Sequence, residues 1–73
     1  MSEVLIDGRE LSPPEPFVRV QAALATLPRE GQVKLLLPRE PFPLYEALRR
    51  AGFVWSTVLE ASGTYVITIR HGP

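Results

Sequence analysis

The sequence predicts a two-layer α/β domain of the α+β sandwich class, in which one mixed four-stranded sheet carries two helices on one face. Runs of β-type residues alternate with helical periodicities in the order β-α-β-α-β-β, and strands that alternate with helices imply parallel crossovers. The last two strands are joined by a short connection that contains glycine, which adds an antiparallel hairpin. The chain has 73 residues, so a single domain over residues 1–73 accounts for all of it.

The first strand is predicted at residues 4–6, a short apolar run that ends at the turn dipeptide of residues 7–8. Three prolines then fall within residues 13–16. Proline disrupts the interior of a helix but suits its first turn, so the first helix is predicted to begin there. Ser12 followed three residues later by Glu15 is typical of a capping box.

Apolar side chains recur at helical spacing along the first helix, whose far end is bounded by Pro28 and Gly31. These side chains are Phe17, Val20, Leu24 and Leu27. The second strand is predicted at residues 32–37, and Pro38 ends it. Alternation places three apolar side chains of this strand on one face: Val33, Leu35 and Leu37.

The second helix is predicted to begin at Pro43 and to end at Gly52, a natural C-terminal stop. Its apolar stripe consists of Leu44, Ala47, Leu48 and Ala51. β-Branched and aromatic residues fill residues 53–59 and 64–69, which predicts two strands. The short connection between them contains a glycine, so the two strands are predicted to form a hairpin.

Two helices cover only one face of a four-stranded sheet, so the other face is predicted to be open to solvent. Strand alternation is expected to place apolar side chains there, namely Leu5, Leu36, Val54 and Val58 or their alternation partners. Exposed apolar patches are typical of interfaces. We therefore expect this open face to form a homodimer or to dock a partner protein.

Composition argues against several classes of function. The chain has no cysteine, which removes disulfides, thiolate metal sites and a cysteine nucleophile. Its eight basic and eight acidic residues balance, which argues against nucleic-acid binding. The one histidine, His71, is expected to be an exposed residue near the C-terminus, and a single histidine without an acidic cluster does not make a metal site.

No nucleophile or general acid–base pair can be placed, so the protein is predicted to be no enzyme, with no catalytic residue, metal or cofactor. Its aromatic residues suit strand faces and a helix end, and are interpreted as core or core-edge residues: Tyr45, Phe53, Trp55 and Tyr65. The longest plainly apolar run is residues 35–37, far shorter than a membrane span or a signal segment requires. We therefore expect no membrane contact and a cytoplasmic location.

Charged residues in two loops make the first candidate site. The loops that follow the first two strands lie together at the carboxyl ends of parallel strands, where ligands bind in open α/β sheets. Arg9, Glu10 and Glu15 in the first loop are therefore expected to approach Arg39 and Glu40 in the second. We hypothesise that this edge binds a small acidic ligand or a partner loop. The alternative is a set of solvated ion pairs, each contributing about 0–1 kcal/mol.

The proline turn at residues 13–16 also has two interpretations. One is a rigid entry to the first helix, which lowers the entropy of the unfolded chain. The other is a docking surface that includes Pro13, Pro14 and Glu15, because a helix N-terminus offers free N–H groups. The prolines remove some of those donors, which disfavours an anion site.

The same proline turn resembles that of the TusA/SirA-like fold. The sulfur carriers of this fold have a Cys-Pro-x-Pro motif where the present chain has Pro13-Pro14-Glu15-Pro16, so Pro13 stands at the cysteine position. The chain is more similar to the uncharacterised DUF2249 family, whose members share three motifs. Asp-x-Arg-x-Leu-x-Pro-Pro-Glu-Pro is matched at residues 7–16, Pro-x-Pro-Leu-Tyr at residues 41–45 and Gly-Phe-x-Trp at residues 52–55.

The resemblance covers nearly the whole chain and implies a single TusA/SirA-like domain. Many relatives have a His-Asp pair where this chain has Arg39 and Glu40, so a metal or acid–base role of that histidine would be lost here. The family's domains often occur beside hemerythrin-like domains. The resemblance thus implies an accessory module that acts by protein–protein contact in metal, redox or sulfur metabolism. The alternative is a regulator that binds a small acidic ligand at the loop edge around Arg9 and Arg39.

Overall fold

The computed structural model describes residues 2–73 and contains four strands and two helices. In chain order these are β1 (Glu3–Asp7), α1 (Glu15–Ala25), β2 (Gln32–Leu37), α2 (Phe42–Ala51), β3 (Phe53–Leu59) and β4 (Tyr65–His71). The predicted order β-α-β-α-β-β is confirmed, and β2 and β3 have the predicted bounds.

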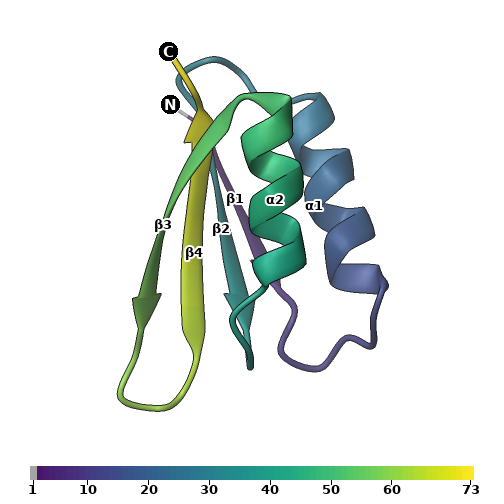
Figure 1. The fold of residues 1–73 in the computed structure, drawn as a ribbon, viewed down its shortest axis with the longest axis vertical. Coiled ribbons are helices and arrows are strands. Elements are labelled where there is room, and N and C mark those ends of the chain that lie inside the picture. Colours follow the sequence, from purple (N-terminus) through teal and green to yellow (C-terminus); the bar gives the residue numbers. More distant parts are fainter. Residues whose placement is uncertain (1) are drawn as a thin grey trace.

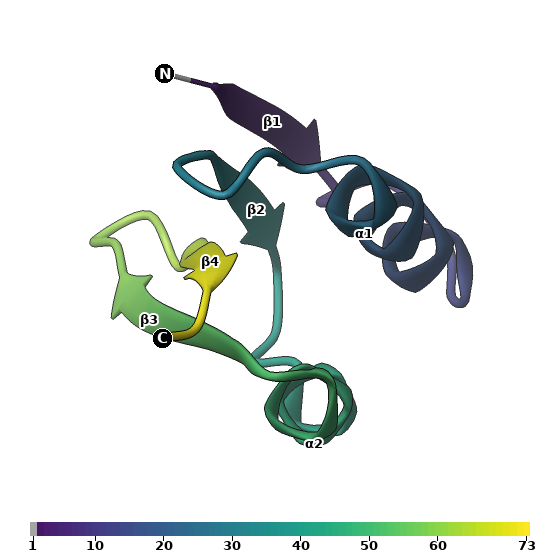
Figure 2. The ribbon, with the colours of Figure 1, turned by 90° about the horizontal axis from the view of Figure 1, so that it is seen from above.

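The four strands form one mixed sheet in the order β1-β2-β4-β3. β1 and β2 are parallel, whereas β4 is antiparallel to both β2 and β3. Both helices lie on the same side of this sheet, as Figures 1 and 2 show, and the other face has no covering element. The predicted two-layer architecture with an open sheet face is therefore confirmed.

The core lies between the sheet and the helices. It follows strand alternation, because every second residue of β2 and β4 points towards the helices. The buried apolar side chains are Ile6, Val20, Leu27, Val33, Leu35, Leu37, Leu44, Leu48, Ile67 and Ile69. The predicted aromatic residues pack against this core as half-buried side chains, which confirms their placement at the core or its edge.

The expected capping box at the start of α1 is absent, which corrects that prediction. The N-cap residue is Pro14, and no side chain bonds to the helix start. Ser12 lies two residues too early, and its backbone carbonyl accepts a hydrogen bond from the Glu15 N–H at 2.9 Å. The Glu15 carboxylate turns forward to Arg19, at 3.0 Å. The Pro13–Pro14 peptide bond is cis.

α2 ends as predicted at Gly52, whose φ of +87° is the left-handed conformation that glycine adopts most readily. The same residue anchors the last residues of the chain, because the Gly72 N–H donates to its carbonyl oxygen at 3.0 Å. A Cβ atom on Gly72 would lie 2.3 Å from that oxygen. Gly52 is therefore required by its left-handed conformation, and Gly72 by the close approach of the two backbones.

Candidate functional site

At the end of β1, the loop edge is organised by an ion pair between Asp7 and Arg9. Arg9 donates from Nε to Asp7 Oδ1 at 2.9 Å and from Nη2 to Oδ2 at 2.7 Å, while its backbone N–H donates to Oδ1 at 3.2 Å. These hydrogen bonds lower the pKa of Asp7 to about 2 and raise the pKa of Arg9 above its usual value. Both side chains remain about half exposed, so water screens the pair.

The two charged loops make no ion pair with each other within residues 2–73. Three of their charged side chains have nearer partners. Arg9 pairs with Asp7, Glu15 pairs with Arg19, and Glu40 accepts a hydrogen bond from the Tyr45 hydroxyl at 3.1 Å. Glu10, Pro13, Pro14 and Arg39 are exposed, and their role in binding stays a prediction.

Beside the second loop, Tyr45 is the centre of a network that the residue pattern did not reveal. Its hydroxyl lies 2.5 Å from Thr57 Oγ1 as well as bonding to Glu40. Its ring stacks on Trp55, with centroids 5.1 Å apart and planes 11° from parallel, and Phe42 meets it edge-on at 5.8 Å. Burial is the main cause that raises the pKa of Tyr45 above 10. The network therefore ties α2 to β3.

Several residues of the three sequence motifs take part in this network or in the Asp7–Arg9 pair. The Asp-x-Arg opening forms the bidentate ion pair. Tyr45 of the second motif stacks on Trp55 of the third. The motifs were the only signal for this contact, because helix and strand periodicity does not tell which helical aromatic meets which strand aromatic. These residues thus have structural contacts that need no bound ligand.

His71 corrects the expectation of an exposed terminal histidine. β4 extends to this residue and pairs it with Phe53, which brings it to the helix side of the sheet. The half-buried ring lies with Nε2 at 2.8 Å from the Leu27 carbonyl oxygen and packs on Phe53. A ring N–H therefore donates to that carbonyl, and this bond joins β4 to the segment that follows α1.

On the open sheet face, apolar side chains adjoin one another in one row, whereas the neighbouring rows mix apolar and polar side chains. Strand register places Asp7, Leu36, Val66 and Val58 side by side across the sheet, and the next row contains Leu5, Lys34, Thr68 and Ser56. We call Leu36, Val58 and Val66 the apolar row. Val58 is 59% exposed. The register places Leu5, Leu36, Val54 and Val58 on this face, as predicted.

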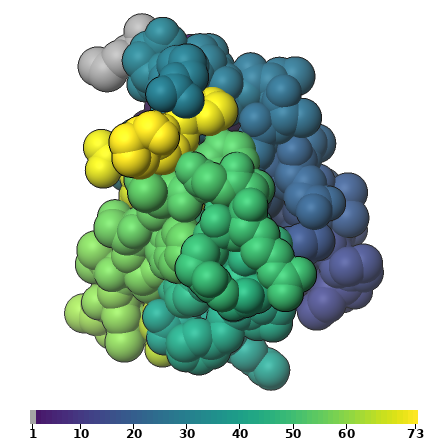
Figure 3. All heavy atoms as spheres, turned by 45° about the horizontal axis from the view of Figure 1, so that its top comes forward, coloured from purple at the N-terminus to yellow at the C-terminus, as the bar shows by residue number. Residues whose placement is uncertain are grey.

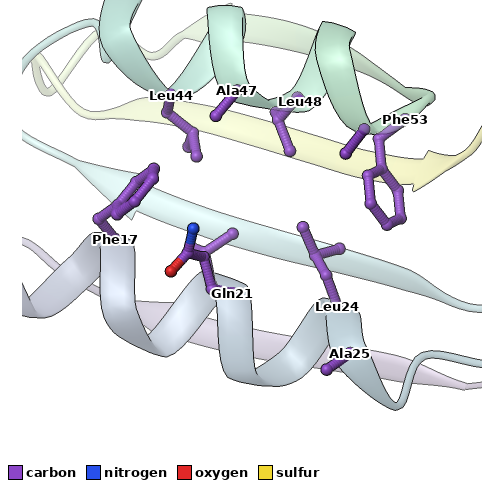
Figure 4. A pocket seen from close by; sticks show the side chains of 10 residues that line it. Phe17, Gln21, Leu24, Ala25, Leu44, Ala47, Leu48 and Phe53 are labelled. Atoms are coloured by element: carbon purple, nitrogen blue, oxygen red, sulfur yellow. The ribbon is translucent and has the colours of Figure 1, made fainter.

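A second apolar surface is the groove between the two helices, which stand side by side over the sheet (Figure 3). The groove has a volume of about 290 Å³. Figure 4 shows Phe17 and Leu44 facing each other across it, with the Gln21 amide between the helices. Its other lining residues are Val20, Leu24, Ala25, Ala47, Leu48, Ala51 and Phe53. Gln21 is its one polar lining residue among those described.

Two further features are absent from residues 2–73. No helix in this range is long and apolar enough to cross a lipid bilayer. No group of three or more His, Cys, Asp or Glu side chains in the same range is placed to hold a metal ion. A hollow lined by Asp7, Arg9 and Glu10 is present at the loop edge.

Comparison with known proteins places this fold and these motifs in a family. The model of the family described as "Uncharacterized conserved protein (DUF2249)" matches residues 5–71. The chain belongs to the DUF2249 family. Among solved structures, it is similar to the SirA-like protein from Desulfitobacterium hafniense, with 25% sequence identity over 96% of this chain and 99% of that chain and a TM-score of 0.83. A comparison with curated proteins gives no match. The expected SirA-like fold is thereby confirmed.

Proposed function

We propose that this DUF2249 protein is a non-enzymatic binding module that acts by contact with a partner protein, in metal, redox or sulfur metabolism. The apolar row carries the proposal. Three apolar side chains lie next to one another on the uncovered face of the sheet. Folded chains that act alone tend to leave such faces polar, and contiguous exposed apolar side chains are typical of interaction sites.

The geometry of the apolar row suits a protein interface. Burying a valine or leucine side chain fully contributes about 1.5–3 kcal/mol, so three side chains that are already partly covered would contribute about 3 kcal/mol together. The Asp7–Arg9 pair lies at one end of the row and Lys34 in the neighbouring row. An apolar centre with charged groups around it has the layout of a transient interface.

The pKa shifts of Asp7 and Tyr45 lead away from the values that suit a general acid or base. A general acid or base works best with a pKa near the operating pH. Here the pKa of Asp7 is about 2, and the pKa of Tyr45 is raised above 10. Both shifts lead away from neutrality. Hydrogen bonds with Arg9 lower the pKa of Asp7, and burial is the main cause that raises the pKa of Tyr45.

The alternative, a regulator that binds a small acidic ligand, has less support. The guanidinium of Arg9 already makes a two-point contact with Asp7. An acidic ligand would have to displace that carboxylate, which is held in the geometry a ligand would use. Arg39, which has no ion-pair partner among residues 2–73, would then act alone. The observation that favours this function is the hollow lined by Asp7, Arg9 and Glu10 at the loop edge.

The test is affinity capture of partners from a lysate of the source organism, with wild-type protein and two variants compared. Val58→Thr/Val66→Thr keeps β-branched shape on the strands but makes the apolar row polar. Arg39→Ala is the matched control on the loop edge. We expect a captured protein to be retained by the control and lost with the double variant, with both variants folded by circular dichroism. Retention by Val58→Thr/Val66→Thr together with loss from Arg39→Ala would overturn the proposal in favour of the loop edge.

A further inference from the structure

The edge strand β3 lacks the features that normally stop an exposed strand from pairing. Its seven residues, Phe53–Leu59, include no charged residue and no proline. Natural proteins usually protect such edges with lysine, proline, bulges or short strands. At the opposite edge, the shorter β1 has an acidic residue at each end, Glu3 and Asp7. Figure 2 shows β3 at one end of the sheet, with no strand beyond it.

The hydrogen bonds at both ends of β3 show which of its backbone groups are free. The Glu60 N–H donates to the Thr64 carbonyl at 2.9 Å, and the Gly72 N–H donates to the Gly52 carbonyl at 3.0 Å. In an antiparallel pair, every second residue bonds to the neighbouring strand. The even-numbered residues from 52 to 60 therefore face β4. The odd-numbered residues direct their N–H and C=O groups outward: Phe53, Trp55, Thr57 and Leu59.

Side chains on both sides of this edge favour an apolar, extended segment. On the helix side, the Tyr45–Trp55 stack lies next to the edge, and Phe42 extends it to the surface, where it is 66% exposed. On the open face, Val54 and Val58 are 42% and 59% exposed. An added strand would thus meet apolar surface with alternate side chains on each face.

We propose that β3 receives an extended, uncharged segment of a partner protein as a fifth, antiparallel strand. Its main-chain groups would bond to the outward N–H and C=O groups of Trp55 and Thr57, and its alternate side chains would pack on the aromatic stack and on the valines. This is strand addition, in which backbone bonds supply affinity and side-chain contacts supply specificity. The proposal goes beyond the contact of the apolar row, because it rests on the backbone of β3 and on the side chains along its edge.

The experiment uses a peptide that copies residues 65–69 of β4, because these residues carry no charge and β3 already pairs with them on its inner edge. The peptide is titrated into isotope-labelled protein, and hydrogen exchange of the β3 amides is followed by NMR. In the free protein, we expect the amides of Trp55 and Thr57 to exchange much faster than those of Val54, Ser56 and Val58. At saturating peptide, we expect the exchange of Trp55 and Thr57 to slow by about tenfold or more, since each gains a hydrogen bond.

Two variants at one position separate the backbone from the side chain. Thr57→Pro removes an outward N–H without removing a bond to β4, and is tolerated at an edge. Thr57→Val keeps the N–H and removes only the hydroxyl that bonds to Tyr45. We expect peptide binding to Thr57→Val and its loss from Thr57→Pro. Equal binding to both, or no slowing of exchange in the wild-type protein, would overturn strand addition. Neither result bears on capture through the apolar row, so the two proposals fail separately.

Discussion

Removing the Tyr45 hydroxyl is a direct test of how α2 is fixed to β3. The phenol donates one proton to Glu40 and accepts one from Thr57, at 3.1 and 2.5 Å. A neutral hydrogen bond contributes about 0.5–1.5 kcal/mol and one to a charged group about 1.5–3 kcal/mol. Glu40 is only half-buried, so water replaces part of its lost bond. We therefore expect Tyr45→Phe to lower the free energy of unfolding by about 1–3 kcal/mol.

That loss is large for a small domain. A chain of 73 residues is expected to have a free energy of unfolding of about 4–11 kcal/mol. Urea unfolding followed by the fluorescence of the single tryptophan, Trp55, measures the change, since this residue stacks on Tyr45. Tyr65→Phe is the control, because no hydrogen bond from the Tyr65 hydroxyl is seen within residues 2–73. If Tyr45→Phe and Tyr65→Phe had the same stability as the wild type, the role of this network would be refuted.

Three further predictions concern other parts of the fold. Gly72→Ala would place a Cβ atom 2.3 Å from the Gly52 carbonyl oxygen, so we expect urea unfolding to show a free energy of unfolding lower by about 1–3 kcal/mol, as for other overpacked sites. An unchanged urea midpoint would contradict the close approach. The Asp7 carboxyl has a folded pKa of about 2, below the unfolded value of about 3.9, so the stability that it supplies through Arg9 is present above about pH 4 and is lost as the pH falls towards 2. Asp7→Asn should remove this part of the acid sensitivity from the unfolding curves, and an identical pH profile of wild type and variant would disprove this role of the ion pair. Gln21→Leu should fill the groove between the helices and raise the thermal midpoint, by a stability gain of about 0.5–2 kcal/mol, whereas a lower midpoint would show that the amide is needed there.

The strands and their order could be predicted because they depend on local patterns. Alternation in residues 32–37 and the glycine-containing connection before β4 reflect backbone geometry that neighbouring residues impose. The buried side chains of β2, Val33, Leu35 and Leu37, are those that alternation assigned to one face. The open sheet face followed from the count of helices alone, since two helices do not cover both faces of four strands.

The contacts of particular side chains were beyond the reach of sequence patterns. His71 became half-buried because β4 runs two residues further than its β-type residues indicated. The partners of Arg9 and Glu40 depend on the conformations of short loops. Arg9 pairs with the nearby Asp7 and Glu40 accepts from the nearby Tyr45 hydroxyl, so neither pairs with a group in the other loop. The start of α1 also differed, because Pro14 occupies the N-cap position that Ser12 was expected to fill.

The most direct test of partner contact through the open face is NMR mapping of the captured partner onto isotope-labelled protein. The account predicts that the methyl signals of Leu36, Val58 and Val66 shift or broaden on titration, and that the signals of residues 13–16 and of Arg39 stay in place. Changes confined to the two proline-rich loops, with the apolar row unaffected, would contradict it.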